Sequence, residues 1–135
     1  MKTLISTEHG PTTGPYSPGL SVEGWIFLSG QGGFDPNTGK VISDDIAGQT
    51  AQTFRNIEVL LEAAGASLDN VVSCLVHLTD LSQFEAFNAI YEKKFPGTKP
   101  VRTTVRADLV AGMLVEITAV ARASERVTRE PIGRP

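Results

Sequence analysis

The alternation of apolar and polar residues predicts a β-hairpin near the start of the chain. Apolar-rich runs at 20–22 and 25–29 are separated by Glu23 and Gly24, and glycine allows the positive φ that a two-residue turn requires. The second run leads into a glycine-rich segment at 30–33 and then into a dense set of turn-forming residues. We therefore expect a hairpin followed by a loop.

Apolar residues at spacings of three and four predict two helices. The first begins after Asp44 or Asp45, either of which suits the N-terminal cap, and it ends at Gly65, which suits a left-handed C-terminal cap. The second begins at Asp80 or Ser82 and continues to Phe95, after which a Pro-Gly pair stops the pattern.

Three further strands are indicated at 71–79, 101–106 and 113–121, the first and last of them almost continuously apolar. The order of hairpin, helix, strand, helix, strand and strand predicts an α+β domain with two helices on one face of a mixed sheet. Two helices cover only one face, and the strands are too apolar for the other face to meet water. We therefore expect an oligomer whose subunits shield that second face.

Length and charge narrow the class of protein. The 135 residues fit one domain, which we place at 1–123; residues 124–135 carry three arginines and two prolines without apolar periodicity, so we expect a loose tail. A net charge of -3 argues against nucleic acid as a partner. The chain lacks both a run of about 18 apolar residues and a signal-peptide pattern, so we expect a cytoplasmic protein with no membrane partner.

The cysteine and histidine content limits the available chemistry. One cysteine excludes an internal disulfide, and two histidines do not match zinc spacings, so we expect no structural metal. Cys74 and His77 stand three apart in a predicted strand and therefore point to opposite faces; we interpret the thiol as buried and His77 as structural. The segment 30–33 lacks P-loop spacing, and we interpret it as a tight turn, whose other use would be to bring backbone N–H groups close to a small anion.

The predicted strand at 101–106 separates two kinds of side chain. Alternation places its valines on one face and Arg102 and Thr104 on the other, and we expect the valines to meet the helices. Glu116 in the last strand then converges with Arg102 on the uncovered face of the sheet. An arginine, which keeps its proton, either holds an acidic substrate through two parallel hydrogen bonds or forms an ion pair with Glu116 that stabilises the subunit interface.

Six short segments recur in a fixed order in one known family. Each segment is weak evidence alone, but the ordered set is specific. They are Gly14-Pro15-Tyr16-Ser17-Pro18-Gly19, Leu28-Ser29-Gly30-Gln31, Asn56 with Ala63-Ala64-Gly65, Asn88-Ala89-Ile90-Tyr91, Pro100-Val101-Arg102 and Val115-Glu116-Ile117. Over residues 2–123 the chain resembles the Rid family of reactive intermediate (enamine/imine) deaminases, also called the YjgF family.

The resemblance implies a chorismate-mutase-like fold and a homotrimer whose sheets line its centre, with active sites in clefts between subunits. It also implies hydrolysis of short-lived 2-imino or 2-enamino acids to 2-oxo acids and ammonia, with water as the nucleophile and no cofactor. Examples are 2-aminoacrylate, 2-iminopropionate and related aminomuconate-type compounds. Matching positions give Arg102 as the anchor for the substrate carboxylate, and Tyr16, Ser29, Gly30 and Asn88 as pocket residues.

Two positions depart from the family pattern. Thr104 stands where characterised deaminases carry a cysteine, and Thr118 stands where they carry a glutamate. Glu116 does not simply replace that glutamate, because two residues along a strand displace its Cα by about 6.5–7 Å. A hydroxyl still holds a water molecule, so Thr104, Thr118 and Glu116 remain among the candidate substrate-binding residues.

The leading hypothesis is a homotrimeric imine/enamine deaminase that takes a small acidic substrate. The alternative is a Rid-family protein that binds small 2-oxo acids or amino acids as a sensor or regulatory partner without turnover, which the two threonines favour. The ribonuclease activity attached to some relatives is ranked last, because the chain is acidic and lacks a basic stripe or a usable histidine base.

Overall fold

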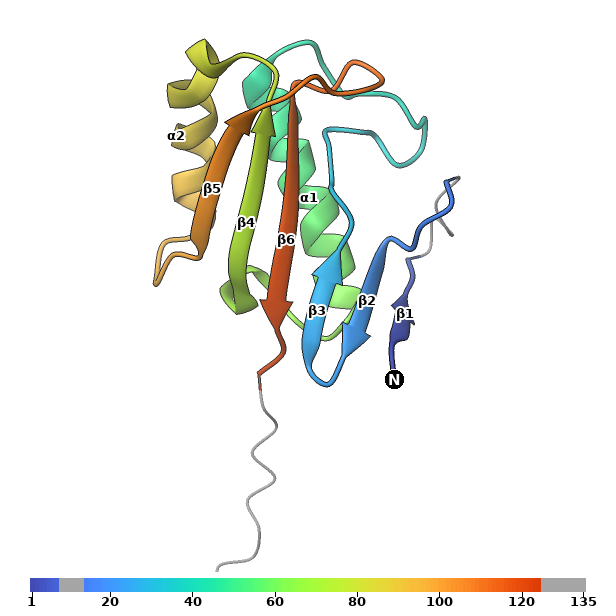
Figure 1. The fold of residues 1–135 in the computed structure, drawn as a ribbon. Helices are drawn as coiled ribbons and strands as arrows, with labels where there is room; N and C mark the ends of the chain where they lie inside the picture. Colours follow the sequence, from blue (N-terminus) through green and yellow to red (C-terminus); the bar gives the residue numbers. More distant parts are fainter. Residues whose placement is uncertain (8–13, 125–135) are drawn as a thin grey trace, which may run out of the picture.

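Six strands form one sheet in the order β1-β2-β3-β6-β4-β5, and two helices lie against it (Figure 1). The computed structural model describes residues 1–7 and 14–124. Only β4 and β5 are parallel, and α2 joins them; every other pairing is antiparallel. The elements are β1 (Thr3–Ile5), β2 (Gly19–Val22), β3 (Trp25–Leu28), α1 (Ile46–Ala63), β4 (Val71–Leu78), α2 (Phe84–Lys94), β5 (Val101–Arg106) and β6 (Val115–Arg122), with short 3-10 turns at Leu68–Asn70 and Leu81–Gln83.

Local sequence signals explain where the elements begin and end. Glu23 and Gly24 form the predicted hairpin turn between β2 and β3, with φ of 49° and 84°. Asp45 caps α1, because its carboxylate accepts a hydrogen bond from the Gly48 N–H at 2.8 Å. Gly65 follows the helix with φ of 77°, as the left-handed cap requires.

The predicted α+β architecture is confirmed, and the sequence pattern missed one strand. β1 has three residues, of which only Ile5 is buried, so its alternation is too short to recognise. The two helices pack together through an aromatic cluster in which Phe54 of α1 contacts Tyr91 and Phe95 from the α2 side at centroid distances of 5.8 Å.

Both helices cover the same face of the sheet and leave the other face open (Figure 1). Along β6 the buried and half-buried positions alternate strictly, with Ile117 and its face partners under α1, and Glu116 and Thr118 on the open side. The open face exposes a set of large apolar side chains, namely Trp25, Phe27, Leu75, Val101 and Val105. The expectation of an uncovered apolar sheet face is therefore confirmed for this chain.

The valines of β5 do not meet the helices, contrary to the expectation from alternation. Val101 is 71% exposed and Val105 is 39% exposed, and both lie on the open face. The opposite side of the strand, which carries Arg102 and Thr104, faces α2 instead. Alternation fixes which residues share a face, but it does not say which face the helix covers.

The C-terminal tail and a membrane-spanning helix are the two remaining features on which the sequence gave an expectation. The loose tail was expected from residue 124 onward, and residues 125–135 lie outside the described part of the structure. Within the part of the chain that is described, no helix is long and apolar enough to cross a membrane.

Gln49, fully buried in α1, ties two loops to the helix. Its Nε2 donates to the carbonyl oxygens of Ser43 at 2.9 Å and Gly112 at 3.1 Å, and its Oε1 accepts from the Leu114 N–H at 2.8 Å. Gly33 lies so close that an added Cβ would come within 2.7 Å of the Gln49 Cα. The loop that contains Ser43 and the loop that contains Gly112 and Leu114 are therefore held by one amide.

We expect Gln49→Met to destabilise the fold while keeping the volume of the side chain. The substitution leaves two carbonyl groups and one N–H without their partner, and an unsatisfied buried group costs about 1–3 kcal/mol. The free energy of unfolding, measured by urea titration, should fall by about 3 kcal/mol or more. The exposed Gln83 offers a matched control, and Gln83→Met should change stability by less than about 0.5 kcal/mol. Equal stability of the two variants would contradict the role given to Gln49.

Candidate functional site

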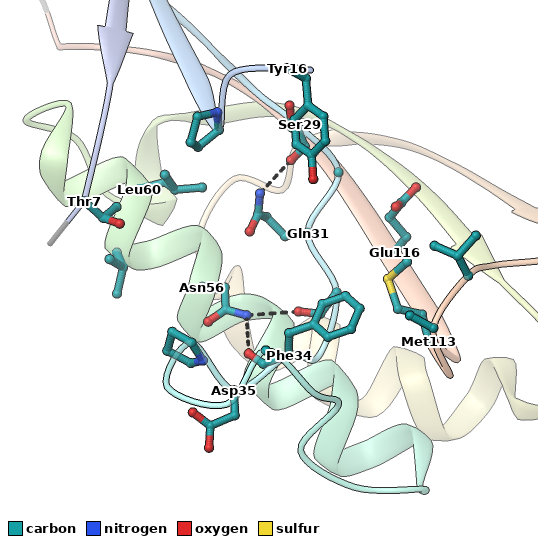
Figure 2. Close-up of a pocket in the computed structure, with 18 residues that line it drawn as sticks. Thr7, Tyr16, Ser29, Gln31, Phe34, Asp35, Asn56, Leu60, Met113 and Glu116 are labelled. Atoms are coloured by element: carbon teal, nitrogen blue, oxygen red, sulfur yellow. Dashed lines mark hydrogen bonds between the residues drawn. The ribbon is translucent and has the colours of Figure 1, made fainter. Parts of the chain in front are cut away.

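A cavity of about 830 Å³ lies beside the glycine-rich segment. Four of the site residues predicted from the sequence line it, namely Tyr16, Ser29, Gly30 and Glu116, and we call these the cavity group. Figure 2 shows Glu116 and Met113 on one side of the strand-to-loop segment, and Asn56 and Leu60 on the other. The remainder of the wall is largely apolar and was not predicted from the sequence; it includes Phe34, Val59, Leu60, Val110 and Met113.

Backbone hydrogen bonds hold the cavity group in place. The Ser29 hydroxyl donates to the Ser17 carbonyl at 2.6 Å, and the Ser29 N–H donates to the Pro18 carbonyl at 2.9 Å. Gln31 exchanges two backbone hydrogen bonds with Ile117 of β6, both at 2.9 Å. Residues 29–31 are therefore clamped between the turn that carries Tyr16 and the central part of the sheet.

Asn56 of α1 fixes the far end of the glycine-rich segment (Figure 2). Its Nδ2 donates to the carbonyl oxygens of Gly32 at 3.0 Å and Phe34 at 2.9 Å, and its Oδ1 accepts from Gln52 at 2.9 Å. Asn56 entered the sequence analysis only as part of a family segment. The available signal was an amide four residues before the buried Leu60 on the predicted helix.

The Glu116 carboxylate lies directly against Gly30. A Cβ added at Gly30 would come within 2.7 Å of the Glu116 Cδ, so glycine is needed for this approach. Glu116 stands opposite His77 in the β4–β6 register, and its Oε1 is 3.8 Å from His77 Nδ1. The two side chains are 28% and 24% exposed, respectively.

Arg102, Asn88 and Thr104 form a second group, which we call the arginine group. Arg102 Nη1 donates to Asn88 Oδ1 at 2.7 Å, and the guanidinium carbon lies 4.6 Å from the ring centroid of Tyr91 and 5.3 Å from that of Phe84. A guanidinium has five N–H donors, so one hydrogen bond leaves others for a ligand. Thr104 follows on the same face, and its Oγ1 is shielded from solvent with no hydrogen-bond partner among the described residues.

Arg102 and Glu116 do not converge within one chain, contrary to the sequence-based expectation. Arg102 faces α2 on the covered side of the sheet, whereas Glu116 lies on the open side opposite His77. The helix supplies two ring faces and an amide oxygen that suit a guanidinium, which explains why the arginine side of β5 turns inward. Within one chain Arg102 and Glu116 therefore do not pair, and an ion pair between them across a subunit interface stays a prediction.

Thr118 belongs to neither group. It stands opposite Leu75 on the open face, one pleat along β6 from Glu116, and it is not among the residues that line the cavity. Within the described residues, no cluster of three or more histidine, cysteine or acidic side chains could hold a metal ion.

Cys74 lies beside Arg102 in the β4–β5 register and is 2% exposed. Burial raises the pKa of its thiol. The interpretation of Cys74 as a buried thiol is confirmed, and so is its placement on the face opposite to that of His77.

Comparisons with known proteins agree with this fold. The family model described as Endoribonuclease L-PSP matches residues 7–123. A RutC family protein of Saccharolobus solfataricus is 42% identical over 92% of this chain and 100% of its own length. A mouse protein named 2-iminobutanoate/2-iminopropanoate deaminase is 37% identical over 90% of this chain and 91% of its own.

The solved structures include YyfA of Yersinia pestis, a Rid-family protein of unknown function. It superposes with a TM-score of 0.87 and 36% identity, over 91% of this chain and 100% of its own. A mixed sheet with two helices on one face is thus the fold of this class of proteins. The chain belongs to the Endoribonuclease L-PSP family, also known as the Rid or YjgF family, as its sequence segments predicted.

We expect Cys74 to be unreactive in the folded protein. Its raised pKa lowers the thiolate fraction at any given pH, and burial blocks access of the reagent. Labelling with a disulfide reagent such as DTNB at pH 8 should be at least about 100-fold slower than labelling in denaturant. Rapid stoichiometric labelling of the native protein would contradict the burial of Cys74 between its neighbours in the sheet, which include Arg102.

Proposed function

We propose that this protein hydrolyses small reactive 2-imino and 2-enamino acids to 2-oxo acids and ammonia. The observation that carries the proposal is the fixed guanidinium of Arg102, held by Asn88 and stacked on Tyr91, beside the unpartnered hydroxyl of Thr104. Such a fork suits a carboxylate, which 2-imino acids carry next to the reacting carbon. The name of the mouse relative, an imine deaminase, supports the same reaction class.

The two groups of site residues suggest how the site is completed. The arginine group and the cavity group lie on opposite sides of one sheet, so a single chain does not present both to one small substrate. We propose a homotrimer in which the arginine group of one copy faces the cavity group of the next. The exposed apolar side chains of the open face support this assembly, because they need cover from another copy.

The reaction requires only water and a positioned substrate. The oxygen of water bonds to the iminium carbon, and the C=N π electrons move to nitrogen. The resulting carbinolamine collapses, the C–N bond breaks with its electron pair on nitrogen, and a 2-oxo acid and ammonia leave. Arg102 holds the carboxylate, while the Gly30 backbone and the Ser29 and Tyr16 side chains shape the water side of the cleft. Fixed orientation of this kind accounts for several kcal/mol of barrier.

Binding of 2-oxo acids or amino acids without turnover is the second candidate function. The feature that favours it is Thr118, a hydroxyl residue at a position where the family resemblance implies a carboxylate. This function needs the arginine group but not a proton-transfer group.

We expect the protein to accelerate the loss of freshly generated 2-aminoacrylate and 2-iminopropionate, measured by trapping with semicarbazide. Arg102→Ala should lower kcat/KM by at least about 100-fold, and Arg102→Lys by about 10-fold or more, because lysine lacks the bidentate fork. Arg55 is exposed on α1 and provides the matched control, Arg55→Ala, which should keep full activity.

Each alternative result has a distinct meaning. Turnover that does not depend on Arg102 would overturn its assignment as the carboxylate anchor. Lack of turnover together with Arg102-dependent binding of a 2-oxo acid such as pyruvate, measured by calorimetry, would favour the binding function over the deaminase.

A further inference from the structure

The cavity wall contains apolar side chains to which the proposed reaction gives no role. Three of them, Phe34, Val110 and Met113, lie close to the residues that shape the reacting end of the cleft, and we call them the apolar subsite. We propose that the apolar subsite selects 2-imino acids whose own side chain is large and apolar, such as isobutyl. The inference rests on the proposed function, since it names the substrate class of the same site.

The glycine-rich segment brings the apolar subsite close to the cavity group. The segment is paired to β6 at its centre and extended there, so Gly30 and Gly32 face the same way. The Glu116 side chain lies against Gly30. A Cβ added at Gly32 would collide with Met113 Sδ and would come within 3.2 Å of Phe34 Cε2. Figure 2 accordingly shows Glu116 and Met113 on the same side of the segment.

The distance along this segment distinguishes short substrates from long ones. Positions two apart in an extended backbone are separated by about 6.5 Å. In the proposed reaction, the carbon that water attacks lies beside Gly30. The methyl group of 2-iminopropionate stays close to that carbon, whereas an isobutyl group extends along the backbone toward Met113 and Phe34. The longer side chain therefore covers the apolar subsite, and the methyl group leaves it uncovered.

Val110 forms the outer edge of the apolar subsite. Its carbonyl accepts the Met113 N–H at 3.1 Å, so the two residues belong to one turn. The Gln49 amide fixes this turn through hydrogen bonds to Gly112 and Leu114. Val110 is 75% exposed in the single chain, and an apolar substrate side chain packed against it removes that surface from water.

The size of the cavity and the chemistry of the apolar subsite favour the same kind of ligand. A volume of about 830 Å³ falls in the range of about 300–1,000 Å³ that holds drug-sized ligands, so a three-carbon acid fills only a small part of it. A polar substrate side chain would lose its water against Phe34, Val110 and Met113 without gaining a hydrogen bond, which is unfavourable. An apolar side chain has no such cost.

The chemistry of such a substrate indicates how it is formed. A large apolar 2-imino acid arises when the corresponding amino acid loses a hydride from C2 to a flavin or nicotinamide and a proton from nitrogen, so that the C=N bond forms. Elimination of water from a short hydroxyamino acid instead gives a short enamine. The proposal therefore places this protein after an amino-acid oxidation.

The test compares two imines that differ only in their side chain. An amino-acid oxidase generates them from alanine and from leucine in the semicarbazide assay. In the parent, kcat/KM for the leucine imine should exceed that for the alanine imine at least about 10-fold, because one methylene in an apolar pocket changes kcat/KM by about 10- to 200-fold. An equal or higher kcat/KM for the alanine imine would overturn the proposal.

The role of Val110 is tested by Val110→Ser, which changes an exposed side chain and therefore leaves folding intact. The variant should lower kcat/KM for the leucine imine at least about 5-fold and keep the alanine imine within about twofold, because only the longer side chain contacts this position. Leu81→Ser, an exposed apolar position outside the cavity wall, is the matched control and should change neither value. An equal loss for both imines, or no loss for either, would overturn the assignment of Val110.

A binding series separates this proposal from the proposed function. A parent that hydrolyses neither imine would overturn the deaminase function. Calorimetry with pyruvate and 4-methyl-2-oxopentanoate then tests the apolar subsite on its own. The longer 2-oxo acid should bind at least about 10-fold more tightly, and Val110→Ser should remove most of this difference. Equal affinities for the two acids would overturn the apolar subsite as well.

Discussion

Two helices cover one face of a six-stranded sheet, and this constraint decides where every functional side chain can lie. Burial of alternate residues under α1 and α2 sends Arg102 toward the ring faces of α2 and leaves Glu116 on the open side with His77. The apolar residues that remain on the open face are too numerous for contact with water alone. In our account, the same geometry that divides the site within one chain also provides the surface through which copies join and complete it.

The glycine-rich segment connects the sheet to the site because it allows approaches that a side chain would block. Gly30 admits the Glu116 carboxylate, and Gly33 admits the backbone of α1 at Gln49. The loop is nevertheless well anchored, by the ladder between Gln31 and Ile117 and by the Asn56 amide. Preorganised backbone of this kind suits catalysis of a simple water addition, for which position matters more than a cofactor.

Periodicity and local turn residues predicted the hairpin, both helices and the caps of α1, because each depends on local spacing. The second helix begins later than Asp80 or Ser82, with Gln83 at its N-cap, because a 3-10 turn precedes it. Periodicity could not predict which side of β5 packs against the helices. The alternation of valines with Arg102 and Thr104 is compatible with either side being covered. The deciding contacts, an amide and two aromatic rings from α2, come from tertiary packing. For the same reason the cavity wall was not anticipated, and neither was the position of His77 opposite Glu116.

The central claim is that one site draws its arginine group and its cavity group from two copies of the chain, and complementation tests it most directly. Arg102→Ala removes the first group, and Gly30→Ala displaces the Glu116 carboxylate of the second. Each variant alone should be inactive in imine hydrolysis. Co-expressed in equal amounts, they should form mixed trimers with about one quarter of the parental activity per site, because each site then combines two intact groups at random. Mixed trimers without activity would show that both groups must come from the same chain and would contradict the account.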